Sequence, residues 1–305
     1  MLTDSPATPP PNQTLEIARW HDARRYLTTS HGDIAYHEVG QGPALLLIHG
    51  FPLNAYHWRD IMDLLAGERR CIVPDLLGLG YSKPKPGADV GSAAQADMLA
   101  ELLDRLGIEQ ADVIANDSGT AITQLLVVSH PGRVRSMLLT NGDVEPDSPP
   151  EPLLPVIEMA QQGAFAEAMV GAAIADKGLA RSGEGVIGLT FADPDGVSDE
   201  AIDLYFKPLI ESPDRVQLTN RYAASLLPNP LAGIEERLRS ITVPAAILWG
   251  TADKFFKPSN VDYLQGVLPN LKQVRHVEGA ALFFPEEHPE LVAEAARELW
   301  RAAGL

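Results

Sequence analysis

The stretch VIANDSGTA, residues 113–121, contains two side chains that could attack a substrate, Asp117 and Ser118. An apolar run precedes the pair and a helical pattern follows it, which predicts a strand that turns sharply into a helix. Small residues stand two before and two after Asp117, whereas Asn and Thr flank Ser118 at the same spacing. A carboxylate in such a turn could attack saturated carbon and form an ester, as in epoxide opening or halide displacement. Asp117 could instead be only the N-cap of the helix.

The chain around this turn alternates between apolar runs and helical patterns. This alternation predicts an α/β fold, in which a mostly parallel sheet is flanked by helices. Residues 26–39 are expected to form a hairpin that turns at 31–32. The other predicted strands are 44–50, 69–75, 111–117, 134–140, 243–250 and 271–279, and the predicted helices are 92–107, 118–132 and 285–300.

The strand–helix rhythm stops in the middle of the chain. Residues 144–232 are rich in Pro, Gly and short amphipathic pieces, which predicts a helical cap inserted into a core of 26–143 and 233–305. Such a cap would cover the carboxyl edge of the sheet, where open α/β sheets bind their ligands. Residues 1–25, with four prolines in the first eleven, are expected to form a mobile N-terminal tail.

Four short motifs fall at the ends of predicted strands: HGFP at 49–52, PDLLGLGYSKP at 74–84, ANDSG at 115–119 and WGTADKFF at 249–256. Together they resemble the α/β-hydrolase family, in particular its branch of epoxide hydrolases and haloalkane dehalogenases. The resemblance covers the chain from about residue 26 onward, apart from the cap. Each motif alone is weak, but the four in this order are a strong signal. They imply an α/β-hydrolase fold with an inserted helical cap.

The resemblance makes Asp117 the nucleophile of this fold. The turn that carries a nucleophile needs small residues on both sides, and Ala115 and Gly119 meet that need. The resemblance also implies an oxyanion hole formed by the backbone N–H groups of Phe51 and Ser118.

Two aspartates could be the acid partner in a catalytic triad. Asp253 in GTAD follows a predicted strand at a place where this fold often puts the acid. A turn aspartate that binds nearby amides would have the same sequence pattern. Asp143 in TNGD is the second candidate, because some relatives place the acid after that strand.

The histidine of the triad is missing from its expected place. The resemblance puts it in the loop after the last strand, where GAALFF places Leu282 instead. His276 lies in the preceding strand, and His288 stands at the start of the last helix. We therefore expect an incomplete triad, in which ester hydrolysis lacks its usual base.

The resemblance also bears on the substrate. Haloalkane dehalogenases hold the halide with an Asn after HG and a Trp after the nucleophile, but Phe51 and Ser118 occupy those positions. Epoxide hydrolases protonate the opening ring with tyrosines of the cap, although a helical tyrosine is more often simply core. The residues expected to contact substrate are Tyr205, Tyr222, Leu282 and Trp249.

Three functions remain open at this stage. The first is a hydrolase of the epoxide-hydrolase type that acts on a small or mid-sized apolar molecule, with water activated by Asp253 or Asp143. In the second, Asp117 is an acid or base in an elimination, isomerisation or cyclisation. The third is a protein that binds an apolar ligand on the same fold without turnover.

Composition limits the partners of the 305-residue chain. A net charge of −17, from 41 acidic and 24 basic residues, argues against nucleic acid and against an anionic membrane. Neither a signal peptide nor an apolar run of ~20 residues is present, so we expect a cytoplasmic enzyme. Cys71 is the single cysteine, and no phosphate-binding loop or metal-ligand cluster occurs, so no cofactor is expected. A small-molecule substrate and a possible homodimer are the partners we expect.

Overall fold

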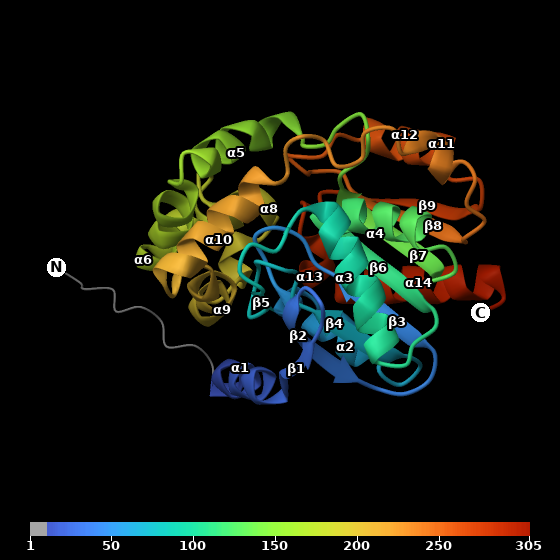
Figure 1. Cartoon of the computed structure of the whole chain (residues 1–305), viewed down its shortest axis with the longest axis horizontal. Helices are drawn as coiled ribbons and strands as arrows, with labels where there is room; N and C mark the ends of the chain where they lie inside the picture. Colours follow the sequence, from blue (N-terminus) through green and yellow to red (C-terminus); the bar gives the residue numbers. More distant parts are fainter. Residues whose placement is uncertain (1–10) are drawn as a thin grey trace.

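The computed structural model describes residues 11–305, and their side chains from residue 16 onward. Within this range a sheet of nine strands lies between two layers of helices (Figure 1). The strands are β1 (Arg25–Thr28), β2 (Gly32–Val39), β3 (Ala44–Ile48), β4 (Arg70–Pro74), β5 (Lys83–Pro84), β6 (Ala111–Asp117), β7 (Val134–Gly142), β8 (Ala245–Gly250) and β9 (Leu271–Val277).

The sheet is antiparallel at one edge and parallel over the rest. Its order is β1-β2-β4-β3-β6-β7-β8-β9, and the short β5 also pairs with β2. Strand β2 runs antiparallel to β1, β4 and β5, whereas every neighbouring pair from β4 to β9 is parallel. This topology confirms the predicted fold class and the predicted hairpin. Parallel strands also bring the ends of β3, β6, β7 and β8 to one edge, where ligands bind in such sheets.

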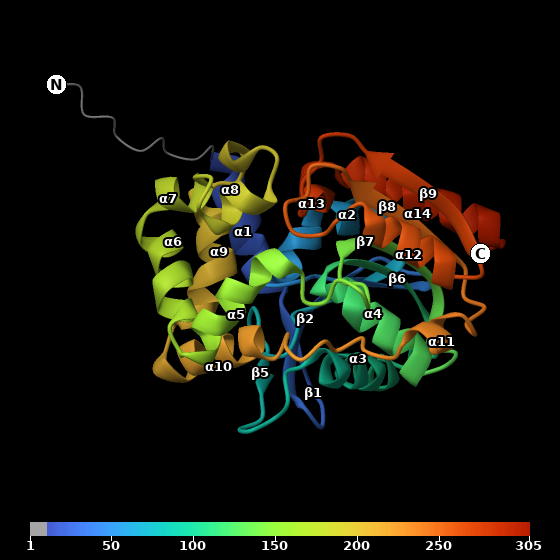
Figure 2. The ribbon, with the colours of Figure 1, turned by 90° about the horizontal axis from the view of Figure 1, so that it is seen from above.

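Helices cover both faces of the sheet. Figure 2 shows α3 and α4 on one face and α2 and α14 on the other, in agreement with their contacts. The helices outside the cap are η1 (Ala55–Trp58), α2 (Arg59–Leu65), α3 (Ser92–Arg105), α4 (Ser118–Ser129), α11 (Glu235–Leu238), α12 (Ser259–Val267), α13 (Phe284–Glu287) and α14 (Pro289–Ala303).

The last predicted helix, 285–300, is divided in two. Helix α13 ends at Glu287, and α14 begins at Pro289. Proline lacks a backbone N–H and fits the first turn of a helix, so it starts a new helix here instead of continuing the old one.

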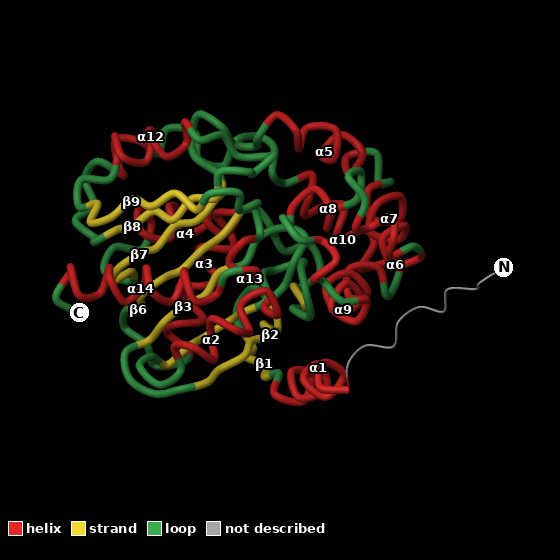
Figure 3. Tube along the Cα trace, turned by 180° about the vertical axis from the view of Figure 1, so that it is seen from behind, coloured by secondary structure: helices red, strands yellow, loops and turns green. Residues whose placement is uncertain are grey.

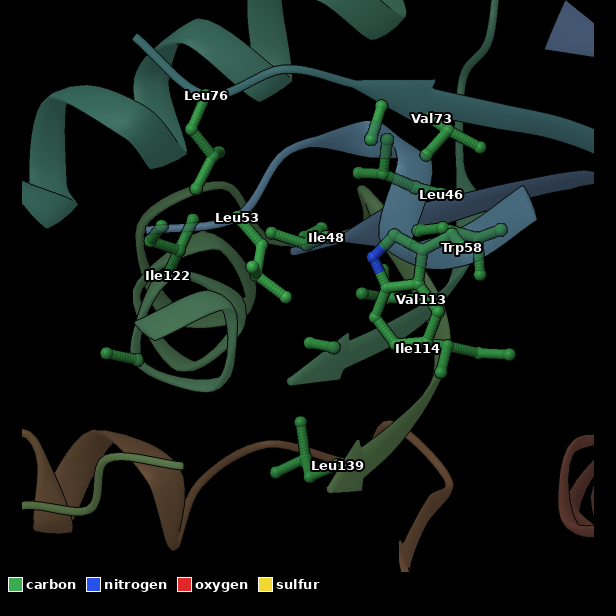
Figure 4. Close-up of a cluster of buried hydrophobic side chains, with 14 of the residues drawn as sticks. Leu46, Ile48, Leu53, Trp58, Val73, Leu76, Val113, Ile114, Ile122 and Leu139 are labelled. Carbon is green, nitrogen blue, oxygen red and sulfur yellow. The ribbon is translucent and has the colours of Figure 1, made fainter. Parts of the chain in front are cut away.

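The hydrophobic core lies on both sides of the central strands. Every residue of β3 and β6 is buried, because helices cover both faces of these strands. Figure 4 shows side chains of these two strands packed with residues of η1, β4, α4 and β7. The labelled residues are Leu46, Ile48, Leu53, Trp58, Val73, Leu76, Val113, Ile114, Ile122 and Leu139. This packing makes a rigid base for the turn at Asp117.

A second group of helices lies beyond the carboxyl edge of the sheet (Figure 3). These helices fall within 144–232, the segment expected to form the cap. They are η2 (Glu151–Leu153), α5 (Leu154–Gln161), η3 (Ala166–Gly171), α6 (Ala172–Ala175), α7 (Lys177–Arg181), α8 (Val186–Thr190), η4 (Pro194–Gly196), α9 (Asp199–Ile210) and α10 (Pro213–Ala224).

The expectation of a mobile tail is wrong for part of residues 1–25. Pro11–Ala23 form helix α1, while residues 1–10 lie outside the described part of the chain. The Trp20 ring stacks on His37 of β2 with 3.7 Å between ring centroids. The Tyr56 hydroxyl donates a hydrogen bond of 3.1 Å to Glu16. These contacts with distant segments hold a helix that the local composition does not favour.

Candidate active site

Asp117 lies at the junction of β6 and α4, in a strained backbone conformation. Its φ of 56° and ψ of −131° make it the only non-glycine residue with positive φ in the described part of the chain. Such strain costs about 1–3 kcal/mol and persists where the surrounding structure enforces it. A Cβ atom on Gly119 would lie 2.4 Å from the Ile48 carbonyl oxygen, so the turn admits only glycine there. The Asp117 side chain makes no hydrogen bond that caps α4, which argues against a simple N-cap.

Backbone N–H groups surround the Asp117 carboxyl. The N–H of Phe51 donates a hydrogen bond of 2.6 Å to Asp117 Oδ2. The N–H of Ser118, at the positive end of α4, also interacts favourably with the ionised carboxyl. A Cβ atom on Gly50 would lie 2.2 Å from the same Oδ2, so glycine at this position lets the carboxyl reach the Phe51 N–H. The two N–H groups expected from the sequence to form an oxyanion hole therefore face this carboxyl.

Two further aspartates influence the charge of Asp117. Burial and, next, the charge of Asp143 raise the pKa of Asp117 well above its usual range, and the N–H groups of Ser118 and Phe51 oppose this rise. Burial raises the pKa of Asp143 to about 7 and that of Asp253 to about 6. The negative charge of Asp143 therefore favours the protonated form of Asp117.

A pocket lies between Asp117 and the cap. Asp117 and Asp143 both line it, and within residues 11–305 no lysine, arginine or histidine does so. Most of the wall is aliphatic or aromatic, and four phenylalanines contribute to it: Phe51, Phe165, Phe255 and Phe256. This wall suits an organic molecule with few polar groups.

Comparison with known proteins agrees with this geometry. A family model described as "alpha/beta hydrolase fold" matches residues 43–178. A solved α/β-hydrolase-fold protein from Burkholderia ambifaria is 25% identical, with a TM-score of 0.77 over 89% of this chain and 96% of that one. The chain has the α/β-hydrolase fold.

Two curated relatives match a central part of the chain. The 2-hydroxymuconate semialdehyde hydrolase of Pseudomonas sp. (strain CF600) is 41% identical over 106 residues, which are 34% of this chain and 38% of that protein. Haloalkane dehalogenase 2 of Mycobacterium tuberculosis is 34% identical over 134 residues, covering 44% and 45% of the two chains. The match thus spans less than half the length of each relative.

Leu282 lines the pocket of this α/β-hydrolase fold, at the position where the resemblance places an imidazole. Its side chain is buried, and its carbonyl oxygen accepts a hydrogen bond of 3.0 Å from Asn116, the residue before Asp117. His276 and His288, the two histidines nearest in sequence, are both exposed. Among the residues described, no histidine is hydrogen-bonded to Asp117.

Asp253 does not line the pocket. Its carboxyl accepts hydrogen bonds from the Asn141 side chain at 2.8 Å and from the backbone N–H groups of Phe255 at 2.7 Å and Phe256 at 3.2 Å. These bonds fix the turn that carries both phenylalanines to the pocket wall. The turn-aspartate interpretation of Asp253 accounts for the two bonds from its own turn, and the bond from Asn141 ties that turn to β7.

The residues expected to contact substrate from the cap and from β8 lie elsewhere. Tyr205 is fully buried, and its hydroxyl donates a hydrogen bond of 2.7 Å to Glu286. Trp249 is fully buried within β8. Neither residue lines the pocket, which corrects the expectation for both. Tyr222 lies one layer behind the wall: its ring stacks on Phe51, and its hydroxyl is 3.3 Å from Ser118 Oγ.

A buried ionic cluster that was not predicted from the sequence joins the cap to the core. Glu286 of α13 accepts a hydrogen bond of 2.7 Å from Arg59 and lies 3.3 Å from the His57 ring, besides its bond to Tyr205. The charge of Arg59 is the main cause that lowers the pKa of Glu286, against burial, to about 2. Glu286 stands in a run of ordinary helical acids, EEHPE, so its sequence carries no signal of this role.

Within residues 11–305 no helix is long and apolar enough to cross a membrane. In the same range no group of three His, Cys, Asp or Glu side chains has the arrangement of a metal site. The three aspartates near the pocket are thus not grouped as metal ligands.

Proposed function

We propose that this protein is an enzyme that opens an epoxide-like electrophile, with Asp117 as the attacking group. The observation that carries the proposal is the position of the Asp117 carboxyl, buried at the pocket and bound to the Phe51 N–H at 2.6 Å. One carboxyl oxygen held by N–H donors leaves the other oriented toward the pocket for attack. The same donors would stabilise the oxyanion that forms when water later adds to the ester.

The wall of the pocket supports an uncharged and mainly apolar substrate. Two acidic side chains and no basic one line it within the part of the chain that the structure describes. An anionic substrate would lose its hydration there and meet no compensating positive charge. The four phenylalanines offer aromatic surface to a ligand with alkyl or aryl groups.

The likeness to haloalkane dehalogenase 2 supports attack at saturated carbon. An aspartate suits that reaction because a carboxylate displaces an alkoxide or a halide and forms an ester. Of the two electrophiles, we favour the epoxide. Neither Phe51 nor Ser118, which occupy the positions expected to hold a halide, offers a side-chain N–H for that purpose.

A second candidate function is acid–base catalysis without an ester. The raised pKa values of Asp117 and Asp143 favour it, because a pair that shares one proton contains both an acid and a base. Such a pair could protonate one atom of a substrate and deprotonate another, which would produce an isomerisation or a cyclisation.

Isotope labelling distinguishes the two candidates. The protein, in molar excess over styrene oxide, is allowed one turnover in water enriched in ¹⁸O. The Asp117 peptide and the product are then analysed by mass spectrometry. We expect ¹⁸O in the Asp117 carboxyl and an unlabelled diol, because water attacks the ester carbonyl. Label in the diol alone would indicate direct addition of water, and a product of unchanged mass would indicate isomerisation; either result refutes the ester.

A further inference from the structure

We propose that Asp143 activates the water that hydrolyses the Asp117 ester, in place of the absent imidazole. This inference rests on the proposed function, since it requires an ester on Asp117. It assigns to Asp143 a direct role in proton transfer, which differs from the role of an acid that orients a histidine.

The sheet brings Asp143 close to Asp117. In the parallel ladder between β6 and β7, Asp117 pairs with Gly142, and neighbouring strands are about 4.8 Å apart. The contact is tight, because a Cβ atom on Gly142 would lie 2.3 Å from the Asp117 carbonyl oxygen. Asp143 follows directly, and its side chain lines the same pocket as Asp117. The two carboxyls therefore border one space that a water molecule or an ester can occupy.

Helix α4 holds both aspartates in place. Asp117 precedes its first residue, and Gln124, nearly two turns further on, donates a hydrogen bond of 2.8 Å to the backbone oxygen of Asp143. The Ser148 hydroxyl donates a hydrogen bond of 2.7 Å to Asp143 Oδ1. The backbone N–H of Asp143 also interacts with its own carboxyl. Among residues 11–305 no other residue is hydrogen-bonded to Oδ2, so this oxygen can take part in proton transfer.

The other candidate bases are less suitable. Asp253 accepts two hydrogen bonds from its own turn and one from Asn141 of β7, and it does not line the pocket. Leu282 carries no proton-accepting group. Within the described part of the chain, Asp143 is thus the remaining carboxylate that faces the position of the ester.

The proposed cycle returns each proton to its starting point. In the reactive form Asp117 is ionised and the proton lies on Asp143. Asp143 gives this proton to the epoxide oxygen while Asp117 forms the C–O bond of the ester. Asp143, now ionised, takes a proton from water as the water oxygen bonds to the Asp117 carbonyl carbon. Collapse of the tetrahedral intermediate breaks the bond between that carbon and the substrate oxygen. The leaving alkoxide takes the proton of the new carboxyl, which yields the diol and restores both aspartates.

The surroundings of Asp143 place this titration near neutral pH. Burial raises its pKa to about 7, the Ser148 hydrogen bond lowers it, and the charge of Asp147 raises it. Lys257 lies 3.6 Å from Asp147 and partly offsets that charge. Asp117 faces Asp143 from β6, but it carries no charge while it is an ester. A base of this pKa is ionised for a large fraction of the time at neutral pH.

The test measures the lifetime of the ester in Asp143→Asn, with Asp147→Asn as the matched control. Asp147 is also buried, but it does not line the pocket and binds Asn260 at 3.0 Å. Each protein is mixed with styrene oxide, freed of excess probe, and followed by mass spectrometry of the Asp117 peptide. In Asp143→Asn the adduct should decay ~10²–10⁴-fold more slowly than in the unmodified protein. In Asp147→Asn the decay should reach the same maximal rate as in the unmodified protein, with its pH dependence shifted to lower pH.

The outcomes separate this inference from the proposed function. An adduct that decays equally fast in Asp143→Asn and in the unmodified protein refutes the role of Asp143 and leaves the nucleophile intact. Absence of any adduct on Asp117 in every variant refutes the proposed function, and this inference with it. If Asp143→Asn does not fold, Ser148→Ala gives the answer, because loss of the hydroxyl should move the pH dependence of ester decay to higher pH. An unchanged profile in Ser148→Ala would count against Asp143.

Discussion

Asp143→Asn should change how the stability of the protein depends on pH. The side chain of Asp143 is buried, and burial is the main cause that raises its pKa from 3.8 to about 7. The folded state therefore prefers the neutral acid, so Asp143 imposes no penalty below about pH 4, where it is protonated in both states. As pH rises toward 7, the unfolded chain releases this proton and the folded chain keeps it, which lowers the free energy of unfolding.

The size of the effect follows from the pKa. Between pH 3.8 and about 7 the folded state loses about 1.4 kcal/mol for each pH unit, which amounts to roughly 4 kcal/mol above pH 7. Asparagine has nearly the shape of the neutral acid and does not ionise. The variant should therefore gain stability relative to the unmodified protein, by a difference that grows from pH 4 to pH 7 and then stays constant.

Urea denaturation, followed by tryptophan fluorescence at pH 5, 6, 7 and 8 and constant ionic strength, measures this difference. Only the difference between variant and unmodified protein is informative, because other buried groups, such as His49 with a pKa lowered to about 3 by burial, also titrate. Glu184→Gln, which changes an exposed acid, serves as the control and should show no such trend. A difference for Asp143→Asn that is flat within about 1 kcal/mol from pH 5 to pH 8 would contradict the electrostatic argument for the pocket.

Three further predictions concern the turn, the cap and the ligand. Gly119→Ala should lower the free energy of unfolding by about 4 kcal/mol in urea denaturation, because its Cβ would lie 2.4 Å from the Ile48 carbonyl oxygen; an unchanged midpoint would contradict it. Glu286→Gln should destabilise by about 3 kcal/mol, because Arg59 loses its buried partner, and a thermal-melt shift of less than about 2 °C would refute this. Benzamide should bind at least about tenfold more tightly than benzoate at pH 8 in calorimetry, since the described residues that line the pocket include no cation; equal affinities would exclude the proposed electrostatics.

The sequence was informative where the backbone itself restricts side-chain size. The turn at Asp117 needs small neighbours, and Ala115 and Gly119 in the sequence alone indicate such a turn. Continuous apolar runs likewise predicted the central strands, since a strand with helices on both faces has no polar side. These features depend on local geometry, so single-sequence patterns predict them well.

Extensive burial also explains why the positions of two side chains, Trp249 and Tyr205, were predicted wrongly. All six residues of β8 are buried, so the sequence around Trp249 does not indicate which face of the sheet the ring occupies. Tyr205 lies in α9 among buried neighbours on several sides, which removes the polar face that would orient the helix. In both cases the side chain is apolar enough for either environment, and only tertiary packing decides between them.

Long-range contacts also could not be predicted from the sequence. Helix α1 begins in a proline-rich segment, and the stacking of Trp20 on His37 holds it against the sheet. Ser148 resembles any loop serine until the fold brings its hydroxyl to 2.7 Å from Asp143. Such partners are close only after folding, so short sequence motifs do not indicate them.

The aliphatic side chain at position 282 has an electrostatic consequence for both pocket aspartates. A protonated imidazole there would stabilise a carboxylate on Asp117 and hold its pKa low. Leu282 supplies no such charge, so the buried carboxyls of Asp117 and Asp143 meet with no counter-ion among the described residues that line the pocket. The charge of Asp143 then raises the pKa of Asp117 further, because no positive charge of the described pocket wall opposes it. Under the proposed mechanism, this leaves Asp143 as the group that exchanges protons with the substrate and with water.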